Sequence, residues 1–208
     1  MTGKFPTQKY PNAGAFVVDY ASAVAKALGS LRPGEVERAV TAMKRAIQSD
    51  RLIFTCGNGG SAAIANHLTC DCSKGIATNT TLRPRVVSLS ATVELVTAIA
   101  NDMAYSEVFA YQLKNAARTG DVLITISSSG DSENIVRALD WAGNNGMTTI
   151  ALSGFSGGRS AQMADISLHV AAENYGVVED VHQSLIHILA QYARMSELPS
   201  ELVQTLRF

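Results

Sequence analysis

The sequence has few of the features that mark secreted or membrane-spanning proteins. It has only 3 cysteines, Cys56, Cys70 and Cys72. Their small and odd number argues against a disulfide framework. Charged residues interrupt every apolar run before it reaches about 18 residues, so we expect no transmembrane helix and no membrane partner. The first residues lack the apolar core of a signal peptide. These absences predict a cytoplasmic protein.

The sequence also lacks an excess of positive or negative residues. The chain has 17 Lys and Arg residues against 18 Asp and Glu residues, a net charge of −1. Nucleic-acid-binding domains normally carry a basic excess, so we expect no nucleic-acid partner. Hydrophobic residues make up 47% and charged residues 17% of the chain, which is typical of a folded globular protein.

The beginning of the chain has only helical patterns. Residues 1–12 are polar, contain Pro6 and Pro11, and are expected to form a loose arm. Apolar residues recur at helical spacing over 16–31, Pro33 and Gly34 interrupt that pattern, and a second helix is expected over 35–49. We divide the chain into an N-terminal arm and helix (1–34) and a main domain (35–208).

Short apolar strands and helices alternate in the main domain. The strands are expected at 51–56, 85–89, 121–126, 147–152 and 166–170, and the helices at 61–73, 92–100, 105–117, 132–144 and 178–195. This alternation predicts an α/β fold, a doubly wound five-stranded parallel sheet with an N-terminal helical extension. Ligands of such sheets bind beyond the carboxyl ends of the strands.

A glycine loop (57–61, sequence GNGGS) follows the first predicted strand. Its glycines allow close approach of a ligand to the backbone, and the following helix N-terminus favours an anion. Asn58 and Ser61 add side-chain donors. The alternative is a tight strand-to-helix turn in which Ser61 only caps the helix.

A serine loop (127–132, sequence SSSGDS) follows the third predicted strand. Four hydroxyls at a helix N-terminus form a neutral phosphate site without lysine. The alternative is a serine-rich surface turn. Neither loop has the Walker or the GxGxxG pattern, which disfavours a nucleoside triphosphate or a dinucleotide as ligand.

Residue types that bind metals occur on two predicted helices. His67 and Asp71 are four residues apart and share a helix face. Glu179 and His187 lie two turns apart on the last helix. Alternatively, His67 and Asp71 form a surface ion pair, and His187 is a core histidine within the apolar stretch LIHIL. His169 lies in a strand and is interpreted as structural.

Five segments together resemble the sugar-isomerase (SIS) domain family, and within it the phosphoheptose isomerases. They are GNGGSAAIANH (57–67), AND (100–102), DVLITISSSGDS (121–132), GMTTIALSGFSGG (146–158) and VEDVHQSLIHIL (178–189). The resemblance covers about residues 35–195 and implies a Rossmann-like SIS fold. It further implies a homotetramer that isomerises sedoheptulose 7-phosphate to D-glycero-D-manno-heptose 7-phosphate, with sites that combine residues of neighbouring subunits.

The resemblance also implies roles for individual residues. Those that match sugar-phosphate contacts are Asn58, Gly59, Gly60, Ser61, Asn101, Asp102, Ser127, Ser128, Ser129 and Ser132. His67, Asp71, Glu179 and His187 match four zinc-binding positions, and His187 also matches the residue assigned to proton transfer.

Two of these positions depart from the family. Asp71 stands where the family has a glutamate that is both ligand and catalytic base, and Glu179 stands where it has a glutamine. Asp is one methylene shorter than Glu, and a base displaced by about 1 Å can cost roughly a hundredfold in rate. A compensating exchange is one hypothesis: Asp71 binds the metal and Glu179 acts as the base.

Other functions stay open at this stage. The same fold serves non-catalytic proteins that bind a phosphosugar or a protein, and isomerases of other sugar phosphates. A metal or redox site formed by Cys70 and Cys72 is disfavoured, because residues two apart on a helix point in different directions.

Overall fold

The computed structural model describes residues 3–208 and has a parallel sheet at its centre. The sheet has the strand order β3-β2-β4-β5-β6, and every neighbouring pair is parallel. The strands are β2 (Leu52–Gly57), β3 (Arg85–Ser88), β4 (Val122–Ser127), β5 (Thr148–Ser153) and β6 (Ile166–His169). The predicted doubly wound five-stranded sheet is therefore confirmed.

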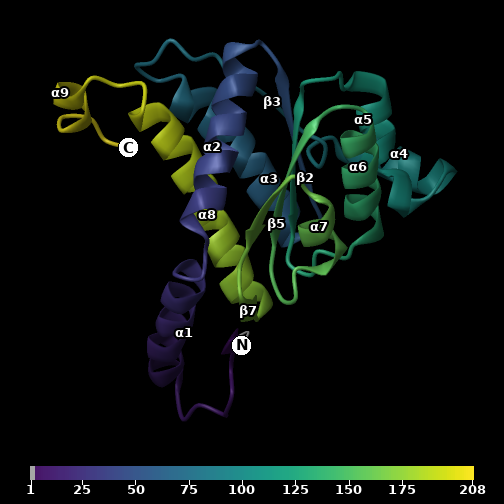
Figure 1. Cartoon of the computed structure of the whole chain (residues 1–208). Coiled ribbons are helices and arrows are strands. Elements are labelled where there is room, and N and C mark those ends of the chain that lie inside the picture. Colours follow the sequence, from purple (N-terminus) through teal and green to yellow (C-terminus); the bar gives the residue numbers. More distant parts are fainter. Residues whose placement is uncertain (1–2) are drawn as a thin grey trace.

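Helices cover both faces of this sheet (Figure 1). One core contains residues of α2 (Pro33–Gln48), α3 (Gly60–Cys70) and α8 (Tyr175–Met195). The core on the other face contains residues of α4 (Val93–Asp102), α5 (Ala110–Ala116) and α6 (Glu133–Asn144). The two cores take alternate residues of β2 and β4, as the two-residue period of a strand requires.

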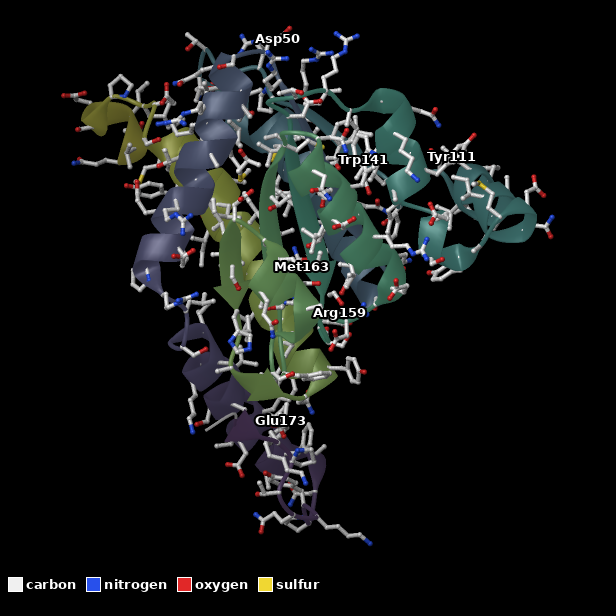
Figure 2. The ribbon with its side chains drawn as sticks, turned by 45° about the vertical axis from the view of Figure 1, so that its right-hand side comes forward. Asp50, Tyr111, Trp141, Arg159, Met163 and Glu173 are labelled. Carbon is white, nitrogen blue, oxygen red and sulfur yellow. The ribbon has the colours of Figure 1, made fainter. Side chains whose placement is uncertain are left out.

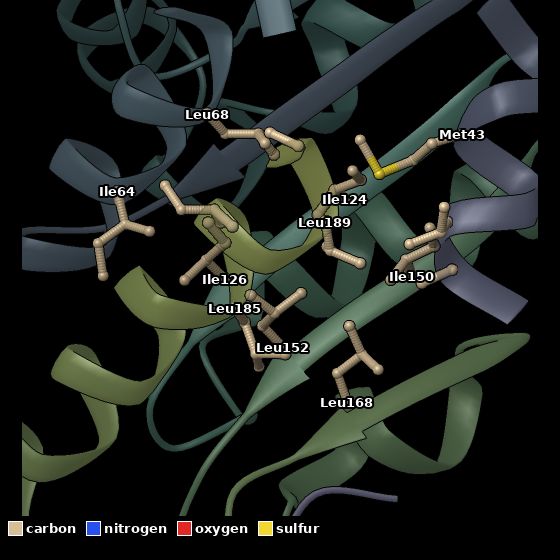
Figure 3. Close-up of a cluster of buried hydrophobic side chains, with 14 of the residues drawn as sticks. Met43, Ile64, Leu68, Ile124, Ile126, Ile150, Leu152, Leu168, Leu185 and Leu189 are labelled. Carbon is tan, nitrogen blue, oxygen red and sulfur yellow. The ribbon is translucent and has the colours of Figure 1, made fainter. Parts of the chain in front are cut away.

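The long helix α8 packs its apolar side against the sheet. Figure 3 shows Leu185 and Leu189 among the strand residues Ile124, Ile126 and Leu152, and all five side chains are buried. Full burial of each such side chain contributes about 1.5–3 kcal/mol. This packing fixes the rotation of α8, so the neighbouring line of Glu179, Gln183 and His187, spaced by four residues, faces a defined direction.

The N-terminal segment differs from the predicted loose arm. Strand β1 (Gly3–Lys4) pairs in parallel with β7 (Ala172–Glu173), and Phe5 packs against the core and against Phe16 of α1 (Ala13–Leu28). The prediction is wrong for residues 3–5 because a β pairing and an apolar ring hold them; residues 1–2 lie outside the described residues. Tyr20 of α1 donates a 2.6 Å hydrogen bond to Asp180 of α8.

Several short elements were not expected. A π-helix, η1 (Asp71–Ile76), continues α3, and a 3₁₀ turn, η2 (Tyr105–Glu107), precedes α5. Two further short helices are α7 (Gly158–Met163), between β5 and β6, and α9 (Ser200–Val203), after α8. No helix in the described part of the chain combines the length and apolar character that crossing a bilayer requires.

Candidate active site

The glycine and serine loops meet at one end of the sheet. They follow β2 and β4, which are neighbours, and the strand order reverses between these two strands. Such a reversal is where doubly wound sheets bind ligands. Figure 2 shows Asp50, near the start of β2, at the top of the molecule and Arg159 of α7 lower down, toward the other end of the sheet. The Arg159 N–H donates to Asp131 of the serine loop at 3.1 Å.

The glycine loop is shaped by steric limits. A Cβ atom on Gly57 would lie 2.5 Å from the backbone oxygen of Ser61, so only glycine permits this turn. Gly59 has φ +53°, and α3 begins at the next residue. The Asn58 side chain is turned toward the protein, where it exchanges two hydrogen bonds with Asn134 and accepts one from Tyr105. Asn58 therefore joins the glycine loop to α6.

The serine loop is held partly by its own hydroxyls. Ser127 Oγ accepts from the Gly130 N–H at 3.1 Å, and Ser129 Oγ accepts from the Asp131 N–H at 3.2 Å. The buried hydroxyl of Ser128 has no hydrogen-bond partner among the described residues. A buried donor without a partner is costly unless a ligand satisfies it, which suits a phosphate oxygen.

A small pocket of about 160 Å³ opens between the two loops. It is lined by Asn58, Ser61, Ile126, Ser127, Ser128, Ser129, Ser132, Tyr175 and Glu179. No lysine or arginine lines it, so hydroxyls and the helix N-termini supply its favourable interactions with an anion. The Glu179 carboxylate lies against the glycine loop, since a Cβ atom on Gly60 would lie 2.5 Å from it.

A second group, the His–Asp cluster (His67, Asp71, His187), lies where α3 and α8 run side by side. Asp71 Oδ2 is 2.8 Å from His187 Nδ1, and Asp71 Oδ1 is 3.3 Å from His67 Nε2. The two imidazole rings are nearly perpendicular, with centroids 5.0 Å apart. Asp71 thus lies between the two histidines, at the residue where α3 passes into η1.

These three side chains fit a metal ion. Each offers one ligand atom, and the three atoms lie within 4.8 Å of one another. Two imidazole nitrogens and one carboxylate form the type of donor set that binds catalytic zinc and keeps a coordination position open. All three side chains are partly exposed, so the cluster is accessible from solvent.

Not every predicted site residue joins these groups within one chain. Glu179 lies at the pocket and is not part of the His–Asp cluster. The cluster is displaced from the pocket along α3 by about 10 Å, the rise of seven helical residues from Gly60 to His67. Asn101 and Asp102, at the end of α4, are exposed and hydrogen-bond to each other; neither lines the pocket.

Three residues near these groups were not identified from the sequence. Asn134 is buried and anchors Asn58, Tyr175 lines the pocket and packs its ring against Phe155, and Gln183 contacts His187. Only Gln183 had a usable signal, because it lies four residues from both Glu179 and His187.

Comparisons with known proteins agree with this architecture. The SIS domain family model matches residues 18–154. The phosphoheptose isomerase of Halorhodospira halophila is 39% identical over 168 residues, which cover 78% of this chain and 83% of that protein. One from Coxiella burnetii (strain RSA 331) is 37% identical over 163 residues, covering 76% and 80%.

A solved structure shows the same overall arrangement. The phosphoheptose isomerase GmhA from Neisseria gonorrhoeae matches with a TM-score of 0.80 at 31% identity, covering 88% of this chain and 97% of that chain. The family match spans more than half of the sequence, and the similarity to these relatives extends over most of both proteins. The chain therefore belongs to the SIS domain family and, within it, to the phosphoheptose isomerases.

Proposed function

We propose that the chain is a metal-assisted aldose–ketose isomerase that converts sedoheptulose 7-phosphate to D-glycero-D-manno-heptose 7-phosphate. The observation that carries this proposal is the convergence of His67, Asp71 and His187 within 4.8 Å. A protein that only bound a phosphosugar would need the pocket but not this cluster. The similarity to proteins named phosphoheptose isomerase supports the reaction class and the substrate.

The pocket is proposed to hold the substrate phosphate. The Ser128 hydroxyl and its neighbours Ser61, Ser129 and Ser132 donate to phosphate oxygens, while Gly59 and Gly60 let the ligand approach the backbone. This binding energy is realised away from the reacting carbons and orients them. Following the family resemblance, Asn101 and Asp102 are assigned to the sugar hydroxyls.

The His–Asp cluster is proposed to act at the carbonyl end of the sugar. Zn²⁺ is the proposed ion; His67, Asp71 and His187 would hold it, and it would supply electrophilic stabilisation of negative charge on the substrate oxygens. The resemblance also assigns proton transfer between oxygen atoms to His187, a role open to the ring only while Nδ1 does not bind the ion. A carboxylate removes the proton from carbon, and Asp71 and Glu179 are the two candidates.

Glu179 is the candidate that the contacts favour as the base. The Asp71 carboxylate is already held between two imidazoles, whereas no described residue donates a hydrogen bond to Glu179. Because Glu179 lies apart from the cluster of its own chain, we propose that it completes the cluster of a neighbouring subunit as the fourth ligand position and base. This requires the homotetramer that the family resemblance implies.

We also propose that the protein is cytoplasmic.

Solvent exchange tests the function directly. The full chain is loaded with Zn²⁺ and incubated in D₂O with ketose phosphates of five, six and seven carbons. We expect deuterium at C1 or C2 of the seven-carbon substrate, and its loss in His187→Ala but not in His169→Gln, whose amide can still donate to the Phe155 carbonyl. Absence of exchange with every sugar, from protein that binds zinc, would favour a non-catalytic binding protein.

A further inference from the structure

Gln183 occupies the side of His187 that faces away from Asp71. It lies one helical turn before His187 on α8 and is half-buried. Its side-chain amide is 2.9 Å from His187 Nε2, while His187 Nδ1 is 2.8 Å from Asp71 Oδ2. Both nitrogens of this ring therefore have a protein partner.

The two partners differ in what they can do. A carboxylate only accepts hydrogen bonds, so a neutral His187 facing Asp71 carries its proton on Nδ1 and leaves Nε2 as an acceptor for the Gln183 N–H. A metal ion held with His67 and Asp71 needs the lone pair of the nitrogen that faces them, which is Nδ1. The proton then resides on Nε2, where it requires an acceptor.

We propose that Gln183 is a positioning residue that supports both forms of His187. An amide carries a donor and an acceptor at the same end, so turning it over replaces its N–H with its oxygen at almost the same place. Gln183 thus donates to Nε2 of the metal-free ring and accepts from Nε2–H of the metal-bound ring. This inference rests on the proposed metal site and adds a residue outside its ligands.

The proposal has consequences for metal affinity. Partners of the second nitrogen of a metal-bound histidine typically change affinity by about 10- to 100-fold when they are removed. Gln183→Leu keeps similar size and removes both functions of the amide. Gln183→Glu keeps only the acceptor, which is the function that the metal-bound form uses. Gln191→Leu, one turn beyond His187 on the same helix, is the matched control.

The first experiment is competition for Zn²⁺ between the full-length protein and a chromogenic chelator. We expect Gln183→Leu to bind zinc roughly 10- to 100-fold more weakly than the unmodified chain, and Gln183→Glu and Gln191→Leu to stay within a few-fold of it. Equal affinity in Gln183→Leu and the unmodified chain overturns the positioning role. Failure of the unmodified chain to bind zinc instead overturns the proposed metal site.

A second measurement tests the positioning role independently of zinc affinity. Two-bond ¹H–¹⁵N NMR spectra distinguish which ring nitrogen carries the proton. In the metal-free form we expect one His187 tautomer with the proton on Nδ1 in both the unmodified chain and Gln183→Leu, because Asp71 accepts that proton in both. Zn²⁺ is expected to move the proton to Nε2, where Gln183 accepts it, so the Nε2 proton should exchange with water more slowly in the unmodified chain than in Gln183→Leu. A tautomer mixture in both metal-free proteins, or no change with bound zinc, contradicts the proposal.

Discussion

Asn58 and Asn134 pair their side-chain amides reciprocally, with each Nδ2 donating to the Oδ1 of the other residue at 2.9 Å. Asn58 lies in the glycine loop and Asn134 in the first turn of α6, directly after the serine loop. The pair therefore fixes the distance between the two loops that form the pocket. Asn134 is only 2% exposed, so water cannot replace its partner.

Asn134→Ala is expected to weaken both the fold and the pocket. It leaves the Asn58 amide without its partner, which costs about 1–3 kcal/mol in the free energy of unfolding. The loosened pocket should raise KM for the sugar phosphate more than it lowers kcat. Urea denaturation and steady-state kinetics measure the two effects. Asn144→Ala, an exposed site on the same helix, is the control, and an Asn134 variant that behaves like it would refute the role.

Substitution by alanine should change stability in opposite directions at Gly130, in the serine loop, and at Gly143, near the end of α6. Gly130 has φ +69°, and a Cβ atom there would lie 2.1 Å from the Gly157 carbonyl oxygen, so Gly130→Ala must displace the serine loop. We expect lost phosphate binding and reduced stability. Gly143 of α6 faces open space, and Gly143→Ala should raise the free energy of unfolding by up to about 1 kcal/mol. Unchanged binding of inorganic phosphate by Gly130→Ala would contradict the assignment.

Substitutions of Asp71 and Glu179 are expected to affect metal binding and turnover differently. Asp71→Asn should reduce zinc binding and turnover together, because Asp71 contacts both histidines. Glu179→Gln should lower kcat by about 100-fold or more, as removal of a general base does, while the His–Asp cluster keeps its metal. Metal analysis beside kinetics distinguishes these cases. Full turnover by Glu179→Gln would instead assign the base to Asp71.

Mixed assemblies test whether the site is shared between subunits. Glu179→Gln and His187→Ala each inactivate every site of their own homotetramer. When the two variants are refolded together, a shared site can combine an intact cluster of one chain with an intact Glu179 of another. We expect a substantial fraction of activity to return. Activity no higher than that of the separate variants would show that each chain uses only its own residues.

Acid should destabilise the protein through His182. Its side chain is fully buried, its ring nitrogens have no hydrogen-bond partner among the described residues, and burial lowers its pKa to about 4. The nearby Ser153 backbone, which favours the charged form, offsets only part of this effect. Between pH 6.5 and about 4 the unfolded chain therefore binds a proton that the folded chain does not.

That difference sets the direction of the pH dependence. The free energy of unfolding should fall by about 3 kcal/mol as pH drops through this window, and level off below it as far as His182 contributes. His182→Gln removes the titrating group and should flatten the curve. The measurement is urea denaturation at several pH values between 7 and 4. Parallel curves for both proteins would exclude His182 as the cause.

The sequence predicted the sheet and both loops because each depends on local patterns. Buried parallel strands are continuous apolar runs, as in 121–126, and the glycine and serine loops follow them directly. The pairing of His67 with Asp71 follows from helical spacing alone. Bringing His187 to them depends on how α8 packs against α3, a tertiary relationship that only the family resemblance anticipated.

Other features had no local signal. The position of Glu179 beside Gly60, away from the His–Asp cluster, depends on the direction in which α8 crosses the sheet. The partial burial of Phe5 depends on aromatic residues of α1, and the Asn134 contact joins residues 76 positions apart. In each case long-range packing outweighed what neighbouring residues indicate.

The π-helical turn that begins at Asp71 limits how residue roles transfer between relatives. A π-turn accommodates one residue more than an α-turn, so the side chains of this last turn, up to Ile76, point in directions that differ from those of a regular helix. In a homologue without this wide turn, the residue equivalent to Lys74 by simple counting would point to a different side of the helix. Deleting one residue from this segment would leave the spacing of His67 and Asp71 unchanged and would change the directions of the side chains between Asp71 and Ile76.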